Sequence, residues 1–236
     1  MKDKRDVDSV IMYSYIGVET LLYIIFVLQD LWNVPSSVTK YLSICICVLA
    51  ALYLMIEKGE MLILGAMAFT LLADTFLLLL DEYYILGVLA FCVVQTLYAG
   101  RLVSKSSGKS IVPRIVLFFV ALVIINSFGV MDMLTVACAW SFSQLVSNVM
   151  HAFLIRNKFK GGWHFVIGLL LFLGCDTCVG LNNLMEYIPE FPFSGIIPLA
   201  AFCMWIFYLP AQVLIVLSFW KTNRNKMEKD ILKYEA

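Results

Sequence analysis

The chain has 236 residues, of which 62% are hydrophobic and 14% charged, with no formal net charge and a mean hydropathy of +0.90. Soluble domains carry about 25% charged residues. This composition therefore excludes a water-soluble globular enzyme, a disordered chain and a nucleic-acid-binding protein. The seven cysteines are odd in number and lie mostly in apolar runs, so they do not form a disulfide framework.

The apolar residues are grouped into segments long enough to cross a membrane, which takes about 20 residues for each helix. Short polar turns separate these segments, so no soluble domain is inserted between them. The pattern predicts an all-α polytopic membrane protein, a single domain over 1–236 with eight transmembrane helices and a short basic tail over 221–236. The predicted helices are 9–29, 38–56, 61–80, 84–103, 111–128, 132–155, 163–184 and 196–220.

The basic residues are distributed unevenly between the two faces that this topology creates. Sixteen of the 17 Lys and Arg residues fall on the face that holds both termini, and only Lys40 falls on the other. Because cytoplasmic loops carry an excess of Lys and Arg, the distribution predicts a multi-pass protein of the cell membrane with both termini in the cytoplasm.

Three acidic residues, Glu19, Asp74 and Asp176, lie inside predicted helices, with no Lys or Arg deep enough to pair with them. Ionisable groups at this depth cost about 3 kcal/mol or more and indicate function by default. Asp74 and Asp176 are each the fourteenth residue of a helix that runs outward, so both lie roughly 20 Å from the cytoplasmic end. The alternative is that these acids only join helices through hydrogen bonds, which we favour for Glu19.

The surroundings of the two aspartates are similar. A Thr follows each of them, and a Gly and a Phe precede each at matching distances. Four helices return the chain to the same side of the membrane, so the similarity suggests a 4+4 parallel repeat. Other polar residues also lie deep enough to line a cavity with them: Gln95, Gln144, Asn148, His151, Tyr208 and Gln212.

Several chemistries lack the residues that they need. Only two histidines exist, both far from the aspartates, so we expect no metal, and without a glycine-rich phosphate loop we expect no cofactor. A G-x-S-x-G motif is absent. Cys175 and Cys178 are interpreted as packing residues, and Gly174-Cys175-Asp176 does not match the second motif of intramembrane aspartyl proteases.

The order and spacing of motifs from Lys40 onward resemble the YhhN family of membrane lysoplasmalogenases. Two of them are Phe69–Asp74 and Leu86–Phe91, and Gln95 stands where the family has His. The remaining matches are Tyr98, Gly168, Phe172, Asp176, Asn182, Tyr208, Ala211 and Gln212, with Cys175 in place of the usual Ser. These departures indicate a divergent member.

The resemblance implies eight membrane helices and hydrolysis of the vinyl-ether bond of lysoplasmalogens, giving a fatty aldehyde and a glycerophospho-base, with Asp74 and Asp176 as the catalytic pair. A vinyl ether is cleaved by protonation at carbon, so one carboxyl group must donate a proton while the other, ionised, stabilises the cation and activates water. Low-dielectric surroundings favour the protonated form of a carboxyl group.

The predicted partner is a membrane lipid or lysolipid substrate, and the oligomeric state is left open. The candidate substrate-binding residues are Lys40, Gln95, Asn182, Tyr208 and Gln212. Lys40 suits a lipid phosphate, although an interfacial lysine that extends toward water is an equal alternative. Two other functions stay open, a small proton-coupled transporter and a non-catalytic lipid-binding protein. Pro210 breaks one helix without an equivalent in the matching helix of the other half, which favours the transporter less.

Overall fold

A computed structural model describes residues 2–106, 111–187, 195 and 197–220, and this part of the chain is helical and contains no strand. The elements are α1 (Lys2–Leu31), α2 (Ser37–Lys58), α3 (Met61–Asp74), the π-helical turn η1 (Thr75–Leu80), α4 (Tyr84–Ser104), α5 (Ile111–Ser127), α6 (Met133–Ile155), α7 (Gly162–Tyr187) and α8 (Ile197–Trp220).

The helices follow the eight predicted segments. Seven are long and apolar enough to span a membrane, while α5, with 17 residues, is shorter. The chain is therefore a multi-pass membrane protein by helix length and composition. The largest difference is at α1, which begins at Lys2 because charged residues can extend a helix into water. The 4+4 repeat stays a prediction, and the basic tail lies outside the described residues.

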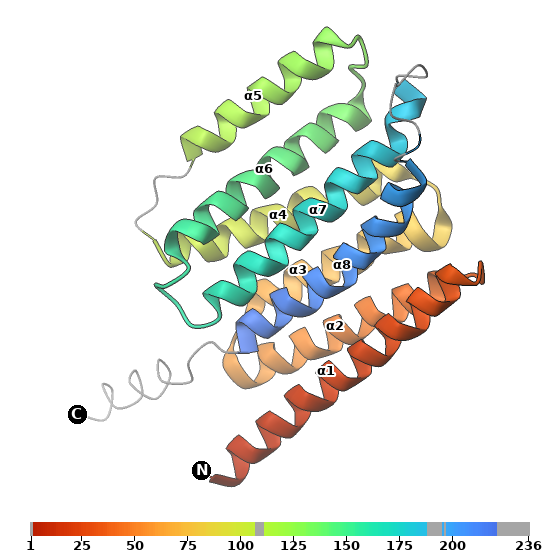
Figure 1. Ribbon diagram of the computed structural model, residues 1–236. Coiled ribbons are helices and arrows are strands. Elements are labelled where there is room, and N and C mark those ends of the chain that lie inside the picture. Colours follow the sequence, from red (N-terminus) through yellow and green to blue (C-terminus); the bar gives the residue numbers. More distant parts are fainter. Residues whose placement is uncertain (1, 107–110, 188–194, 196, 221–236) are drawn as a thin grey trace.

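The helices form a bundle with α1 and α5 at opposite edges (Figure 1). α2, α3 and α4 pack side by side, α6, α7 and α8 do the same, and the two groups meet where α8 contacts α2 and α6 contacts α4. α1, α3, α5 and α7 begin at the same end of the bundle, where α2, α4, α6 and α8 finish. We call it the basic end, because it carries Lys58, Arg101, Arg114 and Arg156.

Close packing between α7 and α8 depends on small residues. A Cβ atom on Gly168 would come within 3.0 Å of the Ala211 carbonyl oxygen and 2.8 Å of Ile215 Cγ1. Gly161, which precedes α7, has a φ of +81°, and its Cβ would overlap the Ser218 carbonyl group. Close backbone approach is the usual basis of helix association in membranes, and here it sets α8 firmly against α7.

Local signals explain where the helices stop. Gly59 ends α2 in the left-handed conformation, as is common at helix C-termini. Asp132 begins α6 with a reciprocal capping box in which its side chain accepts the Thr135 backbone N–H at 2.7 Å. Asp81 and Tyr83 adopt positive φ values of 51° and 55°, so a tight turn joins η1 to α4.

A candidate active site around Asp74

The carboxyl group of Asp74, the last residue of α3, is buried and bonded to α8. Its exposed fraction is 3%, and the Tyr208 hydroxyl of α8 donates to its two oxygens at 3.0 and 2.9 Å. No cation pairs with Asp74 among the described residues. The structure thus brings together two of the candidate site residues, 134 positions apart in the sequence.

Aromatic rings hold Tyr208 in place. Its ring meets Phe172 of α7 at 5.8 Å, Phe91 of α4 at 6.3 Å and Trp205 at 5.5 Å between centroids, all edge to face. Such contacts fix the ring and leave the hydroxyl to find a polar partner. Phe172 comes one turn before Asp176 on α7, so the two aspartates lie at similar depths, within roughly 6 Å along the bundle.

The backbone changes its winding directly after Asp74. η1 begins at Thr75, whose hydroxyl donates to the Leu71 carbonyl at 2.8 Å and lies 3.0 Å from the Tyr41 hydroxyl of α2. A threonine bonded back to the preceding turn loosens the regular helix, and π-helical turns are frequent at functional sites. This turn was not predicted; its signal in the sequence is the Asp74-Thr75 pair.

Three buried side chains near the Asp74–Tyr208 pair have polar atoms without a hydrogen-bond partner in the described structure. They are the Thr70 hydroxyl, the Tyr98 hydroxyl and both amide atoms of Gln212, and each residue is at most 1% exposed. Thr70 and Gln212 lie one turn closer to the basic end than Asp74 and Tyr208. Unpaired buried polar groups are costly, so they indicate positions where water or a polar ligand binds.

Asp176 lies on α7 one turn after Phe172, the residue whose ring contacts Tyr208. It is partly exposed, has no hydrogen-bond partner among the described residues and lies within electrostatic range of Cys138 on α6. Cys175, the residue before it, is within electrostatic range of both Asp176 and Asp74. The two aspartates therefore do not touch each other, and the side chain of Cys175 is near both.

Glu19 has the surroundings of an interhelical contact. Its exposed fraction is 4%, and it accepts hydrogen bonds from Ser43 Oγ and, at 3.5 Å, from Cys47 Sγ, both on α2. Tyr15, one turn earlier on α1, contacts the same thiol at 3.3 Å. These contacts attach α1 to α2, which agrees with the interpretation favoured from the sequence.

Lys40 is already occupied by an internal partner. Its ammonium group lies 2.8 Å from Asp30 Oδ2 and 4.8 Å from the centre of the Trp205 ring, and the residue is only 6% exposed. Ser36 Oγ donates to the same Asp30 carboxylate. A lipid phosphate would have to displace Asp30, so binding of phosphate by Lys40 stays a prediction with a competing internal contact.

Gln95 belongs to a polar network that was not predicted from the sequence. Its Oε1 accepts from Asn148 Nδ2 of α6 at 3.0 Å, while its own Nε2 is buried without a partner. Arg114 of α5 donates to Gln144 Oε1 at 2.9 Å and to Asn148 Oδ1 at 2.8 Å. No described hydrogen bond joins Gln95 to either aspartate.

Arg114, counted from the sequence among the 16 basic residues of the cytoplasmic face, is turned into the bundle. It lies in the first turn of α5, is 7% exposed and extends along α6 into the bundle. Of the remaining candidates, His151 contacts Ser106 Oγ at 2.8 Å, and Asn182 lies half-buried on α7, beyond Asp176. Within the described residues, no group of three His, Cys, Asp or Glu side chains could hold a metal ion.

Comparisons with known proteins agree with the motifs. Searches of curated proteins and of solved structures found no similar protein. The family profile described as the YhhN family matches residues 35–219, most of the chain from the turn before α2 to the end of α8. The matched range contains Asp74, Asp176 and Tyr208, and the chain belongs to the YhhN family.

Proposed function

We propose that this protein hydrolyses the vinyl-ether bond of lysoplasmalogen-type lysolipids, with Asp74 and Asp176 as its two acidic groups. Membership of the YhhN family, which is associated with lysoplasmalogenase activity, supports the proposal. The observation that carries it is a buried carboxyl group, Asp74, held by a tyrosine hydroxyl at membrane depth and not neutralised by a cation among the described residues.

The reaction starts when one carboxylic acid transfers its proton to the vinyl carbon farther from the ether oxygen. The electrons of the double bond form the new C–H bond, and the positive charge is shared by the other carbon and the oxygen. The second, ionised carboxylate stabilises this cation, as in other paired-acid hydrolases.

Water then attacks the cationic carbon and gives its proton to the second carboxylate. As the C–O bond of the hemiacetal breaks, the second carboxyl group protonates the leaving glycerol oxygen, and the hemiacetal hydroxyl gives its proton to the first carboxylate. A fatty aldehyde and a glycerophospho-base are released, and both carboxyl groups are back in their starting states. Thr70 and Gln212 support this step, because their unpaired buried polar atoms lie one turn from Asp74 and Tyr208, where the water or the polar part of the substrate would bind.

The test is aldehyde release by purified protein in lipid nanodiscs supplied with lysoplasmalogen. Wild type should release aldehyde, whereas Asp74→Asn and Asp176→Asn, nearly isosteric changes, should each abolish turnover in a folded protein. Glu19→Gln is the matched control, because it alters a comparably buried acid that only joins two helices. Absence of aldehyde from wild type, or near-normal rates in either aspartate variant, would contradict the proposal; a transporter would release none.

A further inference from the structure

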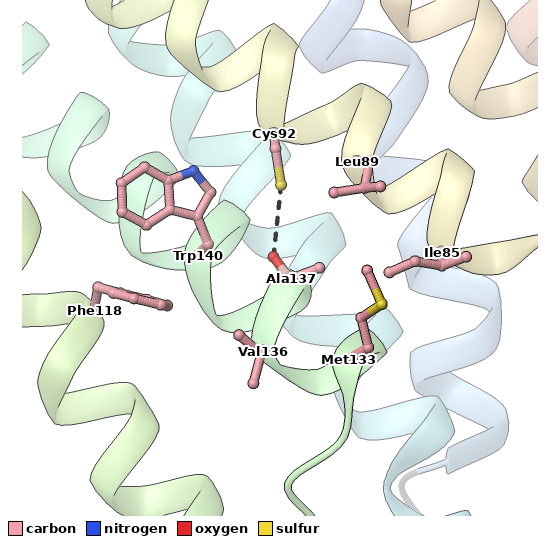
Figure 2. Close-up of a pocket in the computed structure, with 8 residues that line it drawn as sticks. All are labelled: Ile85, Leu89, Cys92, Phe118, Met133, Val136, Ala137 and Trp140. Carbon is pink, nitrogen blue, oxygen red and sulfur yellow. Dashed lines mark hydrogen bonds between the residues drawn. The ribbon is translucent and has the colours of Figure 1, made fainter.

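An apolar pocket opens between α4, α5 and α6, away from Asp74. Its volume is about 380 Å³, and its lining includes Leu89 and Cys92 of α4, Phe118 of α5 and Trp140 of α6. Figure 2 shows these side chains around the pocket, with the Cys92 thiol directed at the Ala137 carbonyl oxygen. The volume falls in the range of small-molecule pockets.

One turn toward the basic end, all three helices change from apolar to polar residues. Arg114 precedes Phe118 by four positions on α5, Gln144 follows Trp140 by four on α6, and Gln95 follows Cys92 by three on α4. These residues and Asn148, which is hydrogen-bonded to Arg114 and Gln95, we call the polar floor; it lies next to the pocket, and none of its four residues is among those that line the pocket itself. It lies roughly 6 Å from the apolar lining along the helix axes.

The polar floor is rich in donors and carries an uncompensated positive charge. The two hydrogen bonds of Arg114 end on amide oxygens, and none of the ion pairs among the described residues includes it. The Nε2 groups of Gln95 and Gln144 are buried without partners, in residues 0% and 5% exposed. A buried charge and two free amide donors require an acceptor, and an anion provides it.

We propose that the pocket and its polar floor bind a single-chain lipid with an anionic head group, a carboxylate or a phosphate. The head group accepts hydrogen bonds from Arg114 and the two glutamine amides, and the acyl chain lies along Phe118 and Trp140. The site uses neither Asp74 nor Asp176, so it stands apart from the hydrolysis proposed above. The proposal is therefore tested by measuring lipid binding and not by measuring turnover.

Trp140 is a built-in reporter, because bromine atoms on an acyl chain quench tryptophan fluorescence on contact. Purified protein in maltoside micelles is titrated with brominated stearate, brominated lysophosphatidylglycerol and, as the neutral control, brominated monoacylglycerol. Quenching is measured in the wild type and in Trp140→Phe, and the difference between the two reports binding at this site. At least one of the two anionic lipids, stearate or the lysolipid, should bind at least about tenfold more tightly than monoacylglycerol. This is the difference expected for a charge-assisted hydrogen bond.

Arg114→Gln should remove this preference for a charged head group, whereas the matched control Arg156→Gln, at the basic end and outside the pocket, should keep it. If Arg114→Gln does not fold, Val136→Phe provides the second test, because it fills the pocket without touching the polar floor and should prevent binding of every chain. Three results would each overturn the proposal. They are equal binding of monoacylglycerol and both anionic lipids, an unchanged preference in Arg114→Gln, and unchanged quenching in Val136→Phe.

Discussion

The hydroxyl of Tyr208 allows Asp74 to be tested without changing its carboxyl group. Tyr208→Phe removes one oxygen atom and keeps the ring against Phe91, Phe172 and Trp205. Asp74 then loses its hydrogen-bond donor while its exposed fraction stays near 3%. The change is therefore electrostatic and leaves packing almost intact.

The size of the effect follows from the contact. A hydrogen bond to a charged group contributes about 1.5–3 kcal/mol, and about 1.4 kcal/mol corresponds to a factor of ten. If the ionised form of Asp74 acts in the reaction, Tyr208→Phe should lower kcat roughly tenfold to a hundredfold. Tyr23→Phe is the matched control, since its hydroxyl makes only a 3.4 Å contact with the Ile206 carbonyl, and it should change kcat little.

The assay is aldehyde release, repeated for Asp74→Asn and for the double variant with Tyr208→Phe. Because the two residues act through one contact, the effects should be strongly non-additive, and the double variant should be no slower than Asp74→Asn alone. A kcat for Tyr208→Phe equal to wild type would refute the reasoning, as would additive effects in the cycle. Either result would mean that the hydrogen bond stabilises the bundle without serving the reaction.

The remaining predictions concern separate parts of the bundle. Asp176→Asn should abolish aldehyde release without changing the elution of the protein in gel filtration, whereas Cys178→Ser, two positions away, should keep activity; equal rates in both would contradict the role of Asp176. Gln95→His should be tolerated and add a titration near neutral pH to the pH–rate profile, while Gln95→Leu should slow turnover; an unaltered rate in Gln95→Leu would argue against any role. Lys40→Met should destabilise the protein by about 1–3 kcal/mol, because Asp30 loses its cation and keeps only the hydrogen bond from Ser36, while staying partly exposed. Asp30→Asn in the same protein should recover part of the lost Tm. Both termini should be accessible to labels only from the cytoplasm, and labelling of either from outside would reverse the topology.

Most helix bounds could be predicted because the apolar runs are separated by short groups of polar and turn-forming residues. The bilayer requirement for about 20 apolar residues per helix and the positions of residues such as Gly59 and Asp132 are local signals. α1 departs from the prediction because its first residues are charged, and hydropathy describes only the part of a helix that lies in the membrane.

The side-chain contacts of the candidate site were harder to predict from the sequence than the helix bounds. The sequence indicated that Asp74 and Tyr208 both lie deep in their helices, but only the structure shows that they bond. An arginine near a helix end usually extends toward water, so the sequence alone does not predict the contacts of Arg114. In the structure it extends in the opposite direction, since Gln144 and Asn148 of α6 offer two amide oxygens.

α4 relates the two proposed sites to each other, because successive residues of a helix turn by about 100°. Phe91 and Tyr98 lie within about 20° of each other, and their rings contact Phe172 and Phe165 of α7. Cys92, about 100° from Phe91, lines the pocket and contacts α6. Gln95 falls between these two faces, about 40° from Phe91, with its Oε1 engaged by α6 and its Nε2 free. In the proposed arrangement α4 thus separates the Asp74–Tyr208 pair from the lipid pocket, and Gln95 lies between the two faces.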